Sequence, residues 1–186
     1  SEDQIIENGK KILKSKLDFL KKEAPKLKFT DMATRRRAFG KWHEIGLKLI
    51  LEEHPDCLVG TSNIHYAQEF GLKQFGTVAH EFFQAHLAFA HPLEATKLAL
   101  LRWMEVFNGD CGTCLTDTFT TKHFLTVFSK YIANAYTGVR HDSGPWDVWA
   151  KMMLDHYEKL GIDPKTKNFV FSDTLTFPKM VEIYKE

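Results

Sequence analysis

The chain has 186 residues, 44% of them hydrophobic and 26% charged, which predicts one globular domain with a core of its own. With 25 basic and 24 acidic residues, the net charge of +1 argues against a nucleic acid or an anionic membrane as partner. No apolar run is long enough to span a bilayer, and residues 1–16 lack the apolar core of a signal peptide. The odd count of three cysteines argues against a disulfide framework and favours a reducing, cytoplasmic compartment.

Residues 1–28 are predicted to form an N-terminal helix and a connector. Apolar side chains recur at helical spacing through residues 2–24, with lysines between them, and Pro25 ends the pattern. A short strand is possible within residues 26–33. A second helix is expected from about residue 35 to residue 53.

From residue 29 to residue 186 the sequence alternates between two kinds of segment. Short apolar stretches run into polar clusters near residues 60–63, 76–80, 116–118, 140–144 and 172–174. Helical patterns follow at about residues 63–70, 79–107, 120–136, 145–160 and 176–185. This alternation predicts an α/β fold with parallel strands and right-handed crossovers, either as an open sheet or as a barrel.

Each polar cluster follows the carboxyl end of a predicted strand, which is the edge where parallel α/β folds bind ligands. Ser, Thr and Asp are also common N-caps, so capping explains any single cluster about as well. Capping does not readily explain His80-Glu81 or the run Arg140-His141-Asp142. We therefore expect a ligand site along this edge.

Zinc and thiol sites are poor fits to the sequence. The HExxH motif requires a second histidine four residues after His80, where Gln84 stands. Cys111 and Cys114 form one CxxC, and Cys57 is a third thiol, but a zinc site usually needs four ligands at compatible spacing. Buried free cysteines are the better interpretation. The sequence also lacks a Walker A or GxGxxG loop, which argues against a standard nucleotide fold.

The residues that remain at the predicted edge suit a small anionic substrate. Arg140 can hold a carboxylate or a phosphate, and Asp142 and Asp173 can accept from ribose hydroxyls or a magnesium-bound water. His80 and Asp117 are a candidate pair of base and orienting acid. Hydroxyl donors near this edge are Thr61, Ser62, Thr77, Thr116, Thr118 and Ser143. A phosphorylated sugar fits this set better than a peptide or a polymer does.

Six stretches, taken in their order and spacing, resemble one family. They are "TRRRAF", "GTSNIHYAQEFGLKQFGTVAHEFFQAH", "LTDTFTTKHFL", "GVRHDSG", "HYEKLGIDPKTK" and "VFSDTL". Together they cover about residues 29–185 and resemble the nicotinate phosphoribosyltransferase family. The resemblance implies an irregular (β/α) barrel and a cytoplasmic enzyme of NAD salvage, often a homodimer. It also implies the synthesis of nicotinate mononucleotide and pyrophosphate from nicotinate and phosphoribosyl pyrophosphate, coupled to ATP hydrolysis and dependent on Mg²⁺.

The resemblance also implies roles for individual residues. His80 matches the histidine that ATP phosphorylates, and Asp117 matches the acid that orients it. Thr77 and Arg140 match positions that hold nicotinate, Arg140 through the carboxylate. The other substrate-binding residues implied in this way are Asp142 at the ribose hydroxyls, Arg35 near the base and phosphates, Ser62 near the ring nitrogen, and Ser143 and Asp173.

The chain departs from the family pattern at three points. Met32-Ala33 stands where the family has Phe-Gly, and Pro145-Trp146-Asp147 stands where it has Asp-Pro. The chain is also about half the family length. Two hypotheses follow: a catalytic-barrel segment or shortened form of this pentosyltransferase, or an inactive fragment or interaction subunit. In the second case its unpaired sheet edges would need a partner, such as the remainder of the same enzyme.

Overall fold

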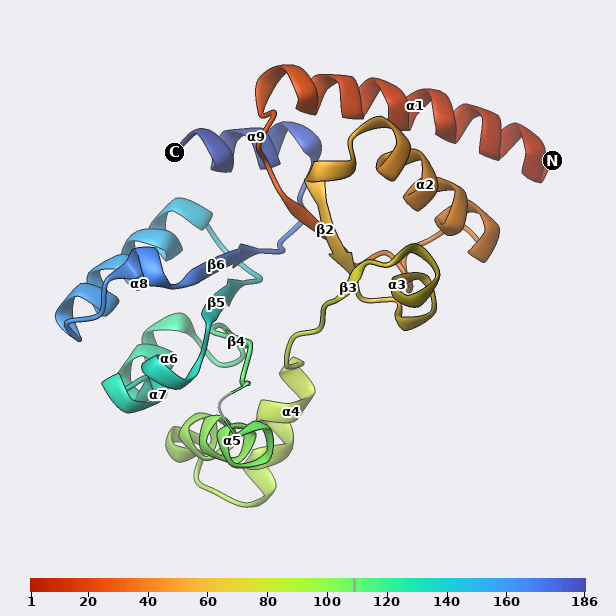
Figure 1. Cartoon of the computed structure of the whole chain (residues 1–186). Coiled ribbons are helices and arrows are strands. Elements are labelled where there is room, and N and C mark those ends of the chain that lie inside the picture. The colour runs from red at the N-terminus through yellow and green to blue at the C-terminus, as the bar shows by residue number, and fades with distance from the viewer. Residues whose placement is uncertain (109) are drawn as a thin grey trace. The chain divides into compact units, whose positions relative to one another are not determined.

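The computed structural model describes residues 1–108 and 110–186. Contacts within the chain divide it into two compact units, which are described separately below. The first unit comprises residues 1–76 and 175–186, and the second comprises residues 77–174. Each unit contains a three-stranded sheet in which neighbouring strands run parallel (Figure 1).

The sheet of the first unit has the order β1-β2-β3. Its strands are β1 (Phe29–Asp31), β2 (Leu58–Thr61) and β3 (Lys73–Gln74). The helical segments of this unit are α1 (Glu2–Glu23), α2 (Gly40–Glu53), η1 (Pro55–Cys57), α3 (Ile64–Phe70) and α9 (Phe177–Lys185).

Helix α1 is amphipathic, as its sequence predicts, and packs against α2 and α9 (Figure 1). Among its buried side chains, Leu17 and Leu20 each belong to one of two hydrophobic clusters of this unit. Ser1 caps the helix in a reciprocal pair of hydrogen bonds with Gln4, which satisfies donors that the first helical turn leaves free. The N-terminal helix is therefore part of the core of the first unit.

The second predicted helix starts later than expected. Helix α2 begins at Gly40, and the arginines from residue 35 to residue 37 lie in the turn and loop before it, where the N–H of Arg36 donates to the carbonyl of Ala33 at 2.8 Å. Three cations in a first helical turn would oppose the helix dipole, so a start beyond them is favoured.

The sheet of the second unit has the order β4-β5-β6. Its strands are β4 (Thr113–Leu115), β5 (Gly138–His141) and β6 (Asn168–Phe171). The helical segments are α4 (His80–Ala85), η2 (His86–Ala88), α5 (Pro92–Phe107), α6 (Thr121–Val127), α7 (Lys130–Ala135), α8 (Trp146–Lys159) and η3 (Pro164–Thr166).

The helix predicted over residues 120–136 is two helices, because Ser129 interrupts it. The Ser129 side chain accepts from the N–H of Ile132 and caps α7. The predicted α/β class, with parallel strands alternating with helices, is confirmed. In the described part of the chain each sheet has two edge strands, so the structure is a partial barrel that does not close. None of the described helices has both the length and the hydropathy that a membrane span requires.

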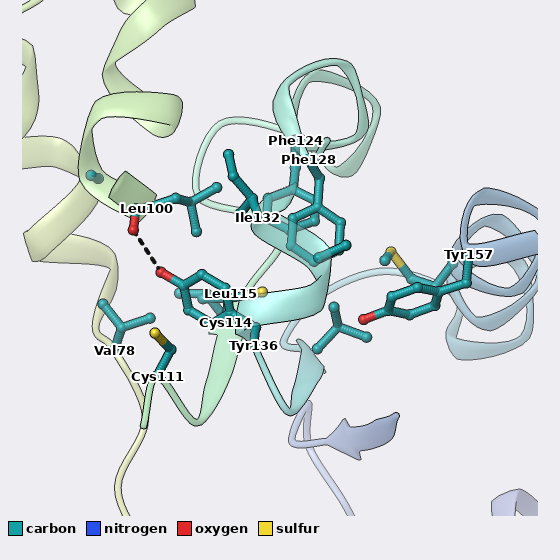
Figure 2. Packing of buried hydrophobic residues seen from close by; sticks show 14 of the residues in the cluster. Val78, Leu100, Cys111, Cys114, Leu115, Phe124, Phe128, Ile132, Tyr136 and Tyr157 are labelled. Atoms are coloured by element: carbon teal, nitrogen blue, oxygen red, sulfur yellow. Dashed lines mark hydrogen bonds between the residues drawn. The ribbon is translucent and has the colours of Figure 1, made fainter. Parts of the chain in front are cut away.

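Two tyrosines lie fully buried in the core of the second unit but differ in hydrogen bonding (Figure 2). The hydroxyl of Tyr136 donates to the carbonyl of Leu100 at 3.0 Å. The hydroxyl of Tyr157 is buried without a hydrogen-bond partner among the described residues. A buried polar atom without a hydrogen-bond partner loses its hydrogen bonds to water and forms none within the protein. The two hydroxyls should therefore contribute differently to stability.

Tyr136→Phe is expected to lower the free energy of unfolding by about 1–2 kcal/mol, because the buried hydrogen bond from its hydroxyl to the Leu100 carbonyl is lost. Tyr157→Phe is its matched control and should leave that free energy within about 0.5 kcal/mol or raise it. Urea denaturation of both variants measures the difference. Equal losses in the two variants would contradict the assigned hydrogen bonding.

Candidate functional site

Polar side chains gather where the three strands of the second unit end. Along a strand, alternate side chains share a face, so Arg140 and Asp142 lie on the same side of β5. The register pairs Leu115 with Arg140 and His141 with Phe171. Continued past the strand ends, this register brings the segments after β4 and β6 beside Asp142. We call the resulting group the rim cluster; its members are Thr77, His80, Asp117, Thr118, Arg140, Asp142, Ser143 and Ser172.

His80 is the first residue of α4, and both of its ring nitrogens have partners. Its Nε2 lies 3.2 Å from Oδ2 of Asp142, and its Nδ1 lies 3.2 Å from Oγ1 of Thr118. A carboxylate only accepts, so in the neutral imidazole Nε2 carries the proton and Nδ1 accepts from the threonine hydroxyl. The His80 side chain is 37% exposed, so a ligand can reach the ring.

Asp117 stands close to His80 without bonding it. Its Oδ2 accepts a hydrogen bond from Ser143. Its Oδ1 is 4.0 Å from Nε2 of His80, close enough for an ion pair but beyond hydrogen-bond distance, and has no hydrogen-bond partner within the described part of the chain. Asp117, expected to orient His80, thus contacts it without a hydrogen bond, and the acid that hydrogen-bonds Nε2 is Asp142.

Arg140 is held by three hydrogen bonds within the cluster. Nε donates to Oγ of Ser172 at 2.8 Å, and Nη1 donates to Oγ1 of Thr77 at 2.7 Å. Nη2 lies 2.9 Å from Oδ1 of Asp142. A guanidinium has five N–H donors, so two have no partner among the described residues, one on each terminal nitrogen. Two such donors suit an oxyanion bound through both oxygens.

Asp142 is the acid that connects these groups. Burial raises the pKa of its carboxyl. Four interactions together lower this pKa by more than burial raises it: the hydrogen bonds from Ser172 and Arg140, the charge of Arg140 and the hydrogen bond from His80. The net result is a pKa below the ordinary value of 3.8. Asp142 is therefore a carboxylate at neutral pH and can pair with both Arg140 and a charged His80, one through each oxygen.

Thr116 and His141, the residues between the rim positions, point to the other face of the sheet. The Thr116 hydroxyl donates to the carbonyl of Arg140 at 3.0 Å and accepts from the indole of Trp149 at 2.8 Å. His141 is buried beside the same indole. Thr116, expected among the hydroxyl donors of the site, instead joins β4, β5 and α8 together.

The remaining predicted residues are not members of the rim cluster. Asp173 follows Ser172, and its Oδ1 accepts from the hydroxyl of Thr174 at 2.8 Å. Arg35 and Ser62 belong to the first unit. His86 is buried, and its Nδ1 lies 2.7 Å from the carbonyl of Phe82.

The first unit holds a second polar group that the sequence did not reveal. Asp31 accepts from Oγ1 of Thr61 at 2.7 Å, and its Oδ2 lies 2.8 Å from Nε2 of His43. Nη1 of Arg37 lies 3.5 Å from Nδ1 of the same histidine. This buried acid and histidine support the loop that carries the three arginines. A possible indication in the sequence was an acid at a strand end, directly before that loop.

The three cysteines are buried. Burial raises the pKa of the Cys57 thiol to about 11 and raises that of Cys114 as well. Such thiols stay protonated at neutral pH and are poor nucleophiles. Within residues 1–108 and 110–186, no group of three His, Cys, Asp or Glu side chains has the arrangement of a metal site.

Comparison with known proteins decides the family. The model of the nicotinate phosphoribosyltransferase (NAPRTase) family matches residues 27–186. The chain belongs to this family. A nicotinate phosphoribosyltransferase of Vibrio campbellii is 45% identical over 183 residues, which are 96% of this chain and 42% of that protein. Nicotinate phosphoribosyltransferase 2 of Pseudomonas aeruginosa is 41% identical, over 97% of this chain and 47% of its own length.

Solved structures of nicotinate phosphoribosyltransferases share the fold. The Vibrio cholerae structure matches with a TM-score of 0.91 and 43% identity, over 94% of this chain and 43% of the other. The Porphyromonas gingivalis structure matches with a TM-score of 0.90 and 35% identity, over 96% and 46% respectively. The family resemblance of the sequence is thus confirmed. The chain spans less than half the length of these relatives.

The depressed pKa of Asp142 predicts how its contribution to stability depends on pH. A carboxyl with a lower pKa in the folded state stabilises the protein above its unfolded pKa, near 3.8, and loses this effect as pH falls through the folded value. Asp142→Asn should therefore cost about 1–3 kcal/mol at pH 7, and the loss should shrink as the pH falls below about 4. Urea denaturation at steps from pH 7 to pH 3 measures it.

Asp155→Asn serves as the control, because that acid is exposed and, among the described residues, pairs with Lys151 of the same helix alone. Its cost should stay within about 0.5 kcal/mol across the range. A loss in Asp142→Asn that is constant with pH would contradict the assigned charge state.

Proposed function

We propose that this chain carries the histidine-bearing part of the catalytic site of a nicotinate phosphoribosyltransferase. The reaction would join nicotinate to the ribosyl carbon of phosphoribosyl pyrophosphate and release pyrophosphate, coupled to ATP hydrolysis through a phosphohistidine at His80. One observation carries the proposal. His80 is accessible and is held between Asp142 and Thr118. Asp142 also pairs with Arg140, which has two N–H donors that no described residue uses.

The geometry of His80 suits phosphate transfer. With Nε2–H donating to Asp142, the lone pair that can attack phosphorus is on Nδ1, which the Thr118 hydroxyl now occupies. As the new N–P bond forms and the bond to the leaving ADP oxygen breaks, the ring gains positive charge. The carboxylates of Asp142 and Asp117, at 3.2 Å and 4.0 Å from Nε2, would stabilise that charge.

Arg140 suits the carboxylate of nicotinate. Its two unused donors can pair with both carboxylate oxygens, while Thr77, Ser172 and Asp142 keep the guanidinium in place. Asp142 would then receive the ribose hydroxyls through Oδ2, whose only described partner is His80 at 3.2 Å. Ser143, which donates to Oδ2 of Asp117, would support that acid.

Magnesium fits this site only together with substrate. Mg²⁺ is commonly held by one or two carboxylates and by substrate phosphates, and it neutralises phosphate charge when bound. Asp173 is the carboxylate we assign to a magnesium-bound water, since one of its oxygens carries no described hydrogen bond. ATP, Mg²⁺, a homodimer and a cytoplasmic location all belong to the same proposal. The rival proposal, an inactive segment that needs the remainder of an enzyme, predicts no chemistry from this chain alone.

His80 is expected to take phosphate from ATP. The chain incubated with γ-labelled ATP and Mg²⁺ should gain an acid-labile, alkali-stable label, and His80→Ala should lose it entirely. The measurement is label retained on the intact chain, with His65→Ala as control because that histidine is 77% exposed at the surface of the first unit. Equal labelling of wild type and His80→Ala would exclude His80 as the acceptor.

Arg140 is expected to select nicotinate over nicotinamide. Removing a charge-assisted pair costs roughly 2–5 kcal/mol, so Arg140→Ala should weaken nicotinate by that amount and nicotinamide far less. Calorimetric titration of both ligands gives the ratio of their affinities. Arg102→Ala is the control, because that arginine is exposed on α5 and pairs with Glu105. An affinity ratio that Arg140→Ala leaves unchanged would refute the assignment.

A further inference from the structure

We propose that Ser172 is a positioning residue for His80, because its hydroxyl keeps the Asp142 carboxylate turned towards the imidazole. The meaning of this role for phosphate transfer rests on the proposed function; the geometric role does not. Ser172 had no assigned role in the sequence, where it stands beside the more conspicuous Asp173.

Strand pairing places Ser172 opposite Asp142. The register of β5 and β6 ends with His141 opposite Phe171, and the N–H of Ser172 continues the ladder by donating to the His141 carbonyl at 3.0 Å. The next pair is Asp142 and Ser172. Both side chains therefore stand on the face of the sheet that carries Arg140.

The Ser172 hydroxyl has one proton and three neighbours. Its oxygen accepts from Nε of Arg140 at 2.8 Å. Its proton is shared between two acceptors, Oδ1 of Asp142 at 2.6 Å and the carbonyl of His141 at 2.7 Å. The hydroxyl thus lies between the arginine and the aspartate and has a donor on one side and acceptors on the other.

This place decides which pairing Asp142 can adopt. Nε and one N–H of Nη2 form an edge of the guanidinium that matches both oxygens of a carboxylate. Here Nε is occupied by Ser172, so Asp142 meets the arginine with Oδ1 alone, at Nη2. The second oxygen, Oδ2, remains available to His80. Without the hydroxyl, Asp142 can close on Arg140 with both oxygens and leave Nε2 of His80 without its acceptor.

The charge state of Asp142 agrees with this arrangement. Burial raises the pKa of the carboxyl, and the hydrogen bond from Ser172 is foremost among the interactions that lower it below its ordinary value. Ser172 therefore helps to keep Asp142 charged as well as turned towards the imidazole.

The test compares Ser172→Ala with Ser172→Thr, which keeps a hydroxyl, and with Thr126→Ala. The control removes a hydroxyl hydrogen bond on α6 that lies outside the rim cluster. Long-range ¹H–¹⁵N spectra of the ¹⁵N-labelled full chain report which ring nitrogen of His80 carries the proton. Circular dichroism and urea denaturation confirm that each variant is folded.

In wild type, Ser172→Thr and Thr126→Ala, Nε2 should carry the proton. In Ser172→Ala the ring should average between its two tautomers. Where wild type takes label from ATP, Ser172→Ala should label about tenfold more slowly, the effect of one lost hydrogen bond to a charged group. Ser172→Thr should label within about twofold of wild type.

Ring-nitrogen shifts in Ser172→Ala that equal those of Thr126→Ala would overturn the proposal, even if the variant were less stable. A wild-type chain that takes no label would count against the proposed function of this chain. The ring-nitrogen comparison would still decide the role of Ser172.

Discussion

The carboxylate of Asp142 is shared by three donors that come from three segments of the chain. Arg140 lies two residues before it on β5, Ser172 follows β6, and His80 begins α4. A partly buried charge is costly unless it is paired and hydrogen-bonded. These three segments are therefore stable together only in an arrangement that keeps their donors within hydrogen-bond distance of the carboxylate. This requirement sets the geometry of the rim cluster. The parallel strands allow that geometry because they end at the same edge of the sheet.

Much of the site could be predicted because periodicity and strand ends are local properties of the sequence. Apolar stretches followed by polar clusters predicted the α/β class and placed Arg140 and His80 at one edge. The partner of His80 could not be predicted in this way. Asp117 and Asp142 both follow strands at that edge, and only the side-chain geometry shows that Asp142 lies 0.8 Å nearer to Nε2, at 3.2 Å against 4.0 Å.

Other differences have equally local causes. Thr116 looked like a hydroxyl of the site, but it stands one residue out of phase with Leu115 and Asp117 and so faces α8. Ser172 had no assigned role, because capping explained its polar cluster about as well as ligand binding did. The register of β5 and β6, which no single segment encodes, gives it a different set of partners.

The contacts that hold His80 and Arg140 all lie within residues 77–174, although family relatives are more than twice as long as this chain. The second unit thus contains, in one compact body, the histidine, the acids and the arginine on which the proposed chemistry depends. The first unit contributes a separate pair, the partly buried Asp31 and the buried His43, next to its arginine loop.

The face of the sheet opposite the rim cluster carries a tryptophan that is hydrogen-bonded, through Thr116, to the strand of Arg140. The Trp149 indole donates to Thr116, whose hydroxyl donates to the backbone carbonyl of Arg140. An intrinsic fluorophore is therefore joined by two hydrogen bonds to the residue that carries the guanidinium, while the indole stays buried. The chain has four tryptophans, so a variant that keeps Trp149 alone gives an optical readout of the strand beneath the site, without a label attached to any residue that would touch a ligand.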